Sequence, residues 1–422
     1  MPKSIVGFLA SILFICGTYR VCSGYSILTH EEVVDLLWAD QIKPLLQARY
    51  PQASEEDLRQ AHAYAYGGCL IQDMGYYPFG NKTFSDMVHY VRSGDFVQAL
   101  LDESTDVNEY AFALGALAHY VSDTVGHPVV NASVAREFPK LKAKYGSSVT
   151  YAEDKKAHIR TEFGFDVVQV AKQRYTSDSY RDFIGFQVAK PVLQRAFIKT
   201  YGIRLDDVFT NLDLSIGSFR WAVSRAIPEM TKVAVETKKD EMVRENPSFA
   251  KKKFLYNLSR SEYEKEWGKN YQKPGFGARF MAALFKIVPK VGPFRAIAFK
   301  MPYPDTETAY LNSVNETVER YRSALRVLRN KDDLVLVNAD FDTGKLTRSG
   351  EYSLADETYA KLLDKLADDK FSALSPNLRR NILAFYQDPN APNAMKKKRD
   401  RWNKTMAELE QLKATQVAAS HY

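Results

Sequence analysis

Apolar residues recur three and four positions apart along most of this chain, which is the spacing of one face of an α-helix. The segments in which this pattern is clearest are 31–50, 54–68, 108–123, 154–175, 219–239, 309–328 and 354–371. Ser54 precedes a run of acidic residues, so we predict that it caps the N-terminus of the second segment. Only 334–341 resembles a strand, and it is short. We therefore predict an all-α fold with many helices.

Residues 1–24 have the features of a secretory signal peptide. Lys3 precedes an apolar run at 5–15, and small residues end the segment. The run is too short to span a membrane, which weakens the alternative of a membrane anchor. A lipoprotein is also a weaker alternative, because the residue before Cys22 is not a small one. We expect cleavage near Gly24 and a secreted or periplasmic protein.

The cysteine content supports export from a bacterium. Cys16 and Cys22 lie in the expected signal peptide, and Cys69 is left alone. A single cysteine cannot form an intrachain disulfide. Export without disulfides is more typical of bacteria than of eukaryotes.

The length of 422 residues exceeds that of one ordinary hydrophobic core, so we expect one large domain with an appendage, or two domains. We divide the mature chain into a helical domain at 25–240, a basic aromatic section at 241–305 and a C-terminal helical region at 306–422.

The basic aromatic section has an uneven charge. From Trp267 to Lys300 it contains seven Lys or Arg residues among many aromatic ones, and no acidic residue. This composition suits contact with an anionic membrane surface. A buried helix pair whose charged ends reach solvent is an equally good interpretation, and nucleic-acid binding is a weaker one. The net charge of +7 falls to +5 when Lys3 and Arg20 leave with the signal peptide, which is only mildly basic.

Two fragments of the sequence carry the candidate chemistry. They are His119-x3-Asp123-x3-His127 and His158-x3-Glu162, both in predicted helices. Residues four apart share one face of a helix, so the first fragment forms a stripe of possible metal ligands. Its two histidines lie roughly 12 Å apart along the axis, whereas zinc binds its ligands at about 2.0–2.2 Å. The stripe therefore predicts more than one metal ion, with Asp123 able to bridge two of them.

Pro128 directly follows this stripe, and the residue before a proline disfavours helical geometry. We therefore expect the helix to end near His127. The chain has seven histidines in all, of which His30 and His89 are further candidate ligands. His62 and His421 are interpreted as ordinary histidines without a functional role.

A polar segment near 338–353 contains the carboxylate-rich pattern Asn338, Asp340 and Asp342, which hints at a calcium loop. Its glycine comes one position late, and Ser349 stands where a calcium loop requires Glu. We predict a plain turn.

With these motifs the sequence resembles the zinc-dependent phospholipase C family, whose relatives include the trinuclear zinc nucleases of fungi and plants. The resemblance covers roughly residues 25–165. It implies one zinc site made by Asp73, His89, His119 and Asp123, a second made by His127, His158 and Glu162, and a third made by Tyr25, His30 and Asp123. In the third site, the free amine and the carbonyl of Tyr25 are the implied ligands, which requires cleavage after Gly24.

The resemblance also implies an activity. It implies phospholipase C-type hydrolysis of phosphodiester bonds in phospholipids, with two to three zinc ions and a phospholipid or membrane surface as partner. Asp73 is the implied catalytic residue, which orients or deprotonates the attacking water. The three-residue gap between Asp123 and His127 is shorter than in secreted bacterial members and resembles the phospholipase D branch that acts on glycosylphosphatidylinositol anchors. That branch, a nuclease and a non-catalytic zinc-stabilised membrane-docking module are the alternatives, with nucleic acid the less expected substrate.

Overall fold

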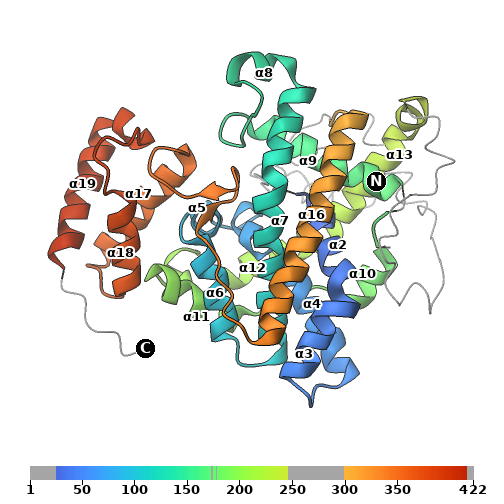
Figure 1. Cartoon of the computed structure of the whole chain (residues 1–422), viewed down its shortest axis with the longest axis horizontal. Helices are drawn as coiled ribbons and strands as arrows, with labels where there is room; N and C mark the ends of the chain where they lie inside the picture. Colours follow the sequence, from blue (N-terminus) through green and yellow to red (C-terminus); the bar gives the residue numbers. More distant parts are fainter. Residues whose placement is uncertain (1–24, 173, 177, 246–298, 416–422) are drawn as a thin grey trace, which may run out of the picture.

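The computed structural model describes residues 25–172, 174–176, 178–245 and 299–415. The expected signal peptide, most of the basic aromatic section (246–298) and His421 lie outside the described residues. Nearly all regular structure in the described part is helical, which confirms the predicted all-α fold (Figure 1).

The helices are α2 (Ile27–Leu37), α3 (Lys43–Arg49), α4 (Glu55–Gly68), α5 (Lys82–Tyr90), α6 (Ser93–Glu103), α7 (Val107–Glu137), α8 (Pro139–Tyr145), α9 (Lys155–Ala171), α10 (Asp178–Ile184), α11 (Lys190–Tyr201), α12 (Leu212–Trp221), α13 (Ile227–Glu245), α16 (Pro304–Asn330), α17 (Ser353–Asp368), α18 (Pro376–Phe385) and α19 (Arg399–Ala414). Short 3-10 helices occupy 71–76, 205–207 and 394–397, and π-helical turns occupy 38–42 and 222–226. Strands β1 (Ala339–Asp340) and β2 (Lys345–Leu346) pair as an antiparallel hairpin, with Ala339 opposite Leu346.

Side-chain caps explain where two of these helices begin. The hydroxyl of Ser54 accepts a hydrogen bond from the N–H of Asp57 at 3.2 Å, and the Asp57 carboxylate accepts one from the N–H of Ser54 at 2.9 Å. This reciprocal pair confirms the predicted N-cap of α4. The carboxylate of Asp106 caps α7 in a similar way, by accepting from the N–H groups of Asn108 and Glu109.

The expectation that a helix ends near His127 is wrong. α7 continues through Pro128 to Glu137. Side chains beyond the proline, among them Val130 and Val134, are fully buried and hold the helix in the core. Here the burial of apolar side chains outweighs the local preference of the residue before proline.

Pro128 has no N–H to donate to the carbonyl of Thr124, one helical turn earlier. The β1–β2 hairpin packs closely against α7 at this point. A Cβ added to Gly344 would lie only 2.5 Å from the carbonyl oxygen of Thr124. Gly344 also has a φ angle of +68°, which side chains disfavour. Only glycine suits both demands, and the close contact joins the hairpin to α7 beside His127.

α7 is the central helix of the fold, and α4 and α16 both pack along it (Figure 1). The approach of α4 depends on two glycines. A Cβ added to Gly68 would lie 1.9 Å from the carbonyl oxygen of Phe112, and one added to Gly115 would lie 2.1 Å from that of Ala65. Neither position has room for a side chain, so these glycines bring the end of α4 against the first third of α7.

The C-terminal helices join the same hydrophobic core as the N-terminal ones. Leu117 of α7, Tyr321 of α16 and Leu363 of α17 all belong to it. The predicted division into 25–240 and 306–422 stays a prediction, and helices from both parts share this core. None of the described helices is long and apolar enough to cross a membrane.

Candidate metal centre

The stripe predicted on α7 lies in the middle of a buried cluster. His119, Asp123 and His127 are each 0% exposed. The Nε2 atoms of His119 and His127 lie 3.0 and 3.4 Å from Oδ2 of Asp123. The two imidazoles thus converge on one carboxylate, although they start about two helical turns apart.

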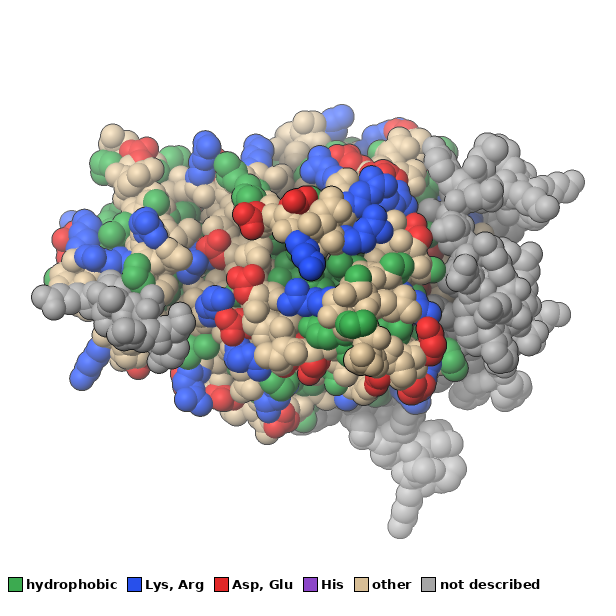
Figure 2. All heavy atoms as spheres, turned by 60° about the horizontal axis from the view of Figure 1, so that its bottom comes forward, with side chains coloured by type: hydrophobic (Ala, Val, Ile, Leu, Met, Phe, Trp, Pro, Cys, Tyr) green, Lys and Arg blue, Asp and Glu red, His purple; other side chains and the backbone are tan. Residues whose placement is uncertain are grey.

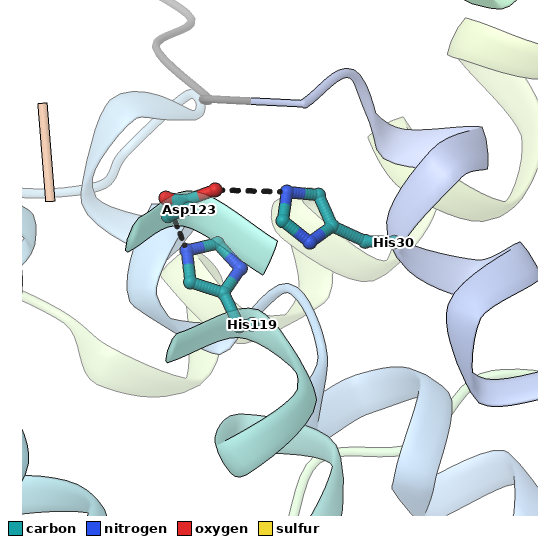
Figure 3. A group of neighbouring side chains, drawn as sticks. All are labelled: His30, His119 and Asp123. Carbon is teal, nitrogen blue, oxygen red and sulfur yellow. Dashed lines mark ion pairs between the residues drawn. The ribbon is translucent and has the colours of Figure 1, made fainter. Parts of the chain in front are cut away.

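Two further helices bring histidines to the same carboxylate. Nε2 of His30, on α2, lies 3.3 Å from Oδ1 of Asp123, and Nε2 of His89, on α5, lies 3.5 Å from Oδ2. Figure 3 shows His30 and His119 pointing toward Asp123 from two different helices. The carboxylate of Asp73 extends the cluster, with Oδ1 3.4 Å from Nε2 of His89.

The second motif fragment lies beside the His127 end of the stripe. On α9, Nδ1 of His158 lies 2.5 Å from Oε1 of Glu162. The imidazole of His158 stacks on that of His127, with the ring centroids 5.4 Å apart. The structure therefore brings the two fragments of the sequence together in space.

Three groups of side chains in this cluster have the geometry to hold a metal ion. They are His30, His119 and Asp123; Asp73, His89 and His119; and His127, His158 and Glu162. Within each group the ligand atoms lie within 4.8 Å of one another. We call the last of them the His127 group. The geometry places His119 in two of the groups, whereas the resemblance implied Asp123 as the shared residue.

Many inward-facing atoms have no hydrogen-bond partner among the described residues. They are Nε2 of His30, His89, His119 and His127, and both carboxylate oxygens of Asp73 and Asp123. A buried polar atom without a partner costs about 1–3 kcal/mol, so such a concentration is unfavourable without a bound ligand. Imidazole nitrogens and carboxylate oxygens are ligands that zinc prefers, and the residues fit such ions.

The charges in the cluster shift several pKa values. Burial alone would lower the pKa of His89, but the carboxylates of Asp123 and Asp73 raise it to about 10. Burial would raise the pKa of Asp123, but the neighbouring histidines hold it well below its usual range. Burial and the nearby His127 lower the pKa of His158 to about 3. Asp123 therefore stays ionised and His158 stays neutral, whereas His89 binds a proton at neutral pH that a metal ion would have to displace.

Backbone carbonyls orient two of the histidines from outside. Nδ1 of His119 donates to the carbonyl of Cys69 at 2.9 Å, and Nδ1 of His89 donates to that of Ser85 at 2.8 Å. Cys69 ends α4, so the glycine crossing of α4 and α7 sets the first of these contacts. Such acceptors fix the tautomer of a ligand histidine and leave Nε2 to face the metal.

Tyr25 also lies beside the cluster. Its ring packs on α7 at Gly126, where an added Cβ would lie 2.6 Å from the ring, and its centroid is 6.0 Å from that of His30. The Tyr25 hydroxyl donates to Oγ of Ser313 at 2.7 Å. The structure thus places Tyr25 as the sequence suggests, while the role of its amine and carbonyl as ligands stays a prediction.

The cluster is closed to solvent. Its histidines and carboxylates are at most 4% exposed. Phe341, from the turn of the β1–β2 hairpin, covers it, with its ring centroid 5.1 Å from that of His89 and 6.0 Å from that of His119. On the face drawn in Figure 2, no histidine side chain is visible among the described residues.

His62 is an ordinary buried histidine, as predicted. Its Nε2 lies 3.0 Å from Oδ1 of Asp35, and its ring stacks on Trp38. These contacts satisfy the side chain without any link to the cluster.

Sequence reasoning missed Asp342. It was assigned to a plain turn, but its carboxylate lies 3.5 Å from Nδ1 of His127. The alternating carboxylates of Asp340 and Asp342 were the available signal, but a sequence pattern does not show which helix lies opposite a turn.

Comparison with known proteins agrees with this geometry. The sequence model of the zinc dependent phospholipase C family matches residues 29–211. Residues 29–211 are therefore similar to a zinc-dependent phospholipase C. All the clustered histidines and carboxylates of the three groups lie within the matched residues, whereas Tyr25 precedes them and Asp342 follows them. No curated protein and no solved structure matches the chain.

Proposed function

We propose that this protein is a zinc-dependent hydrolase that cleaves a phosphodiester bond of phospholipids, with phospholipase C-type products. The observation that carries the proposal is the convergence of three ligand groups in one buried cluster. A structural zinc site needs only four protein ligands. A cluster of eight histidine and carboxylate side chains therefore supports a multinuclear catalytic centre, of two to three zinc ions.

Zinc in such a centre polarises phosphoryl oxygens and lowers the pKa of a bound water. The side chains determine where this chemistry takes place. Asp73 is the proposed catalytic base, because its carboxylate is fully buried and has no hydrogen-bond partner among the described residues. Oδ1 of Asp73 faces His89, so Oδ2 is the oxygen that accepts the proton of the attacking water. Asp123, which faces four histidines, holds the groups together.

The family match supports a phospholipid over a nucleic acid as substrate. One sequence feature favours a second candidate, namely hydrolysis of glycosylphosphatidylinositol-type lipids with phospholipase D-type cleavage. This feature is the three-residue gap between Asp123 and His127. The two activities differ in the product that keeps the phosphate, which is the headgroup after C-type cleavage and the lipid after D-type cleavage.

Purified mature protein is expected to release phosphorylated headgroups from phospholipid vesicles and to lose this activity with a chelator. The measurement is phosphorus NMR of the products from a panel of phospholipids, with single-stranded DNA as a parallel substrate. Phosphatidic acid as the product favours the D-type alternative. Faster hydrolysis of DNA than of every lipid contradicts the proposal, and zinc binding without hydrolysis favours a non-catalytic module.

An extended N-terminus is expected to weaken the centre. We propose that the protein is exported, to the periplasm or the exterior, and that cleavage after Gly24 frees the amine of Tyr25. In a chain that retains Ser23 and Gly24, the nitrogen of Tyr25 is part of a peptide bond and is no longer a free amine. Such a chain should therefore bind about one zinc ion fewer than a chain that begins at Tyr25. Zinc content by mass spectrometry tests this, and equal content in both chains removes Tyr25 from the ligands.

A further inference from the structure

The β1–β2 hairpin lies against the candidate metal centre, although it follows the matched residues 29–211 by a long stretch of sequence. Oγ of Ser93 donates to the carbonyl of Ala339 at 2.6 Å and accepts from its N–H at 3.1 Å. The N–H of Phe341 donates to the carbonyl of His89 at 3.2 Å. With the contact of Gly344 on α7, these bonds fix the turn of the hairpin beside the cluster.

Asp342, in this turn, is 0% exposed and faces the cluster. Its Oδ2 accepts hydrogen bonds from the hydroxyls of Tyr90, at 3.0 Å, and Tyr352. Its Oδ1 lies 3.5 Å from Nδ1 of His127, and neither of these two atoms has a hydrogen-bond partner in the described part of the chain. The two tyrosines thus hold the carboxylate with its other oxygen directed at His127.

The imidazole of His127 stands between two carboxylates. Its Nε2 faces Asp123, at 3.4 Å, while its Nδ1 faces Asp342. The same orientation, with Nε2 inward and an acceptor at Nδ1, occurs in His89 and His119. Those two histidines use backbone carbonyls as acceptors, whereas His127 has the side chain of Asp342.

Asn131 connects Asp342 with the second histidine of the His127 group. Its Nδ2 donates to the carbonyl oxygen of Asp342 at 2.7 Å, and its Oδ1 lies 2.7 Å from Nε2 of His158. The hairpin is therefore linked to both histidines of this group. The side chain of Asp342 faces His127, and its backbone carbonyl is linked to His158 through Asn131.

We propose that Asp342 is a positioning residue of the metal centre. In the metal-bound protein its carboxylate, which lies 3.5 Å from Nδ1 of His127, would accept the Nδ1–H and so direct Nε2 toward a metal ion shared with His158 and Glu162. A carboxylate in this place fixes the tautomer of a ligand histidine and makes its other nitrogen more basic. The inference rests on the proposed function, because it assumes that the His127 group binds metal. Asp342 touches no reacting atom and acts only through His127.

Variants of the full mature chain test this role: Asp342→Ala, Asp342→Asn and, as a control, Asp356→Asn. Asp356 is also a buried carboxylate of the C-terminal region, but it accepts hydrogen bonds from the backbone of Gly350 and Ala394, away from the cluster. The readouts are zinc affinity by competition with a chromophoric chelator, the visible spectrum of the cobalt(II)-substituted protein and the melting temperature.

Asp342→Ala is expected to weaken the binding of one zinc ion by about 10–100-fold and to change the cobalt spectrum. Asp342→Asn keeps an acceptor oxygen, so it should retain most of this affinity. Asp356→Asn should lower the melting temperature and leave zinc affinity and spectrum unchanged.

The positioning role is overturned if Asp342→Ala behaves like the control, that is, if it lowers the melting temperature and leaves zinc affinity and the cobalt spectrum unchanged. Wild-type protein that binds no zinc overturns the proposed function itself. The two failures are therefore distinguishable.

Discussion

Replacing Asp123 with alanine is expected to remove more than one zinc ion per chain and to lower kcat/KM by ~10³-fold or more. One carboxylate oxygen of Asp123 faces His30 and the other faces His119, so a single side chain serves more than one metal position. Metal ions in such centres supply several kcal/mol of transition-state stabilisation, which is lost with them. Zinc content by mass spectrometry and initial rates on a phospholipid measure the two effects.

Asp86→Asn is the matched control for this variant. Asp86 is 1% exposed, and it pairs with Lys82 and Lys361 rather than with a histidine. It should therefore keep its zinc. If Asp123→Ala loses one ion or none, the carboxylate does not bridge.

Removal of metal by a chelator at neutral pH is expected to lower the melting temperature by ~10 °C or more and to abolish hydrolysis. The buried oxygens of Asp73 and Asp123, which have no hydrogen-bond partner among the described residues, would then lose their metal partners. A ligand present at 1,000 times its Kd stabilises the folded state by about 4.1 kcal/mol per site. For a unit of roughly 400 residues, an unfolding entropy of about 2.1 cal/mol/K per residue makes each kcal/mol worth about 1.2 °C, so two occupied sites give about 10 °C.

Differential scanning calorimetry with and without chelator tests this expectation. Addition of zinc should restore the original melting temperature, whereas magnesium should not, because it prefers oxygen ligands to imidazole. A shift of less than about 3 °C on complete metal removal would contradict a metal-stabilised centre.

The helices of this fold follow from local sequence. The three- and four-residue spacing of apolar positions predicted the helical segments, and Ser54 with Asp57 predicted the start of α4. The stripe of His119, Asp123 and His127 was also a local prediction, because four-residue spacing in a helix fixes a common face.

Other features depend on contacts between distant segments and were not predictable from local patterns. The continuation of α7 beyond Pro128 depends on the burial of residues farther along the helix, among them Val130. The contact of Asp342 with His127 depends on a hairpin that folds back over α7. In both cases the deciding energy comes from tertiary packing. A short window of neighbouring residues does not show which distant segments will pack against it.

The contacts around the centre also lead to an expectation about the order in which the protein folds. The hydroxyl of Tyr25 bonds to Ser313, 288 positions later in the chain, and that of Tyr90 bonds to Asp342, 252 positions later. Contacts of such large sequence separation form slowly, because a long loop must close first. During synthesis, the N-terminal histidines leave the ribosome long before the segments that enclose them. We therefore expect closure of the centre to be a late folding step, and a chain shortened before α16 would lack the hydrogen-bond partners of the Tyr25 hydroxyl.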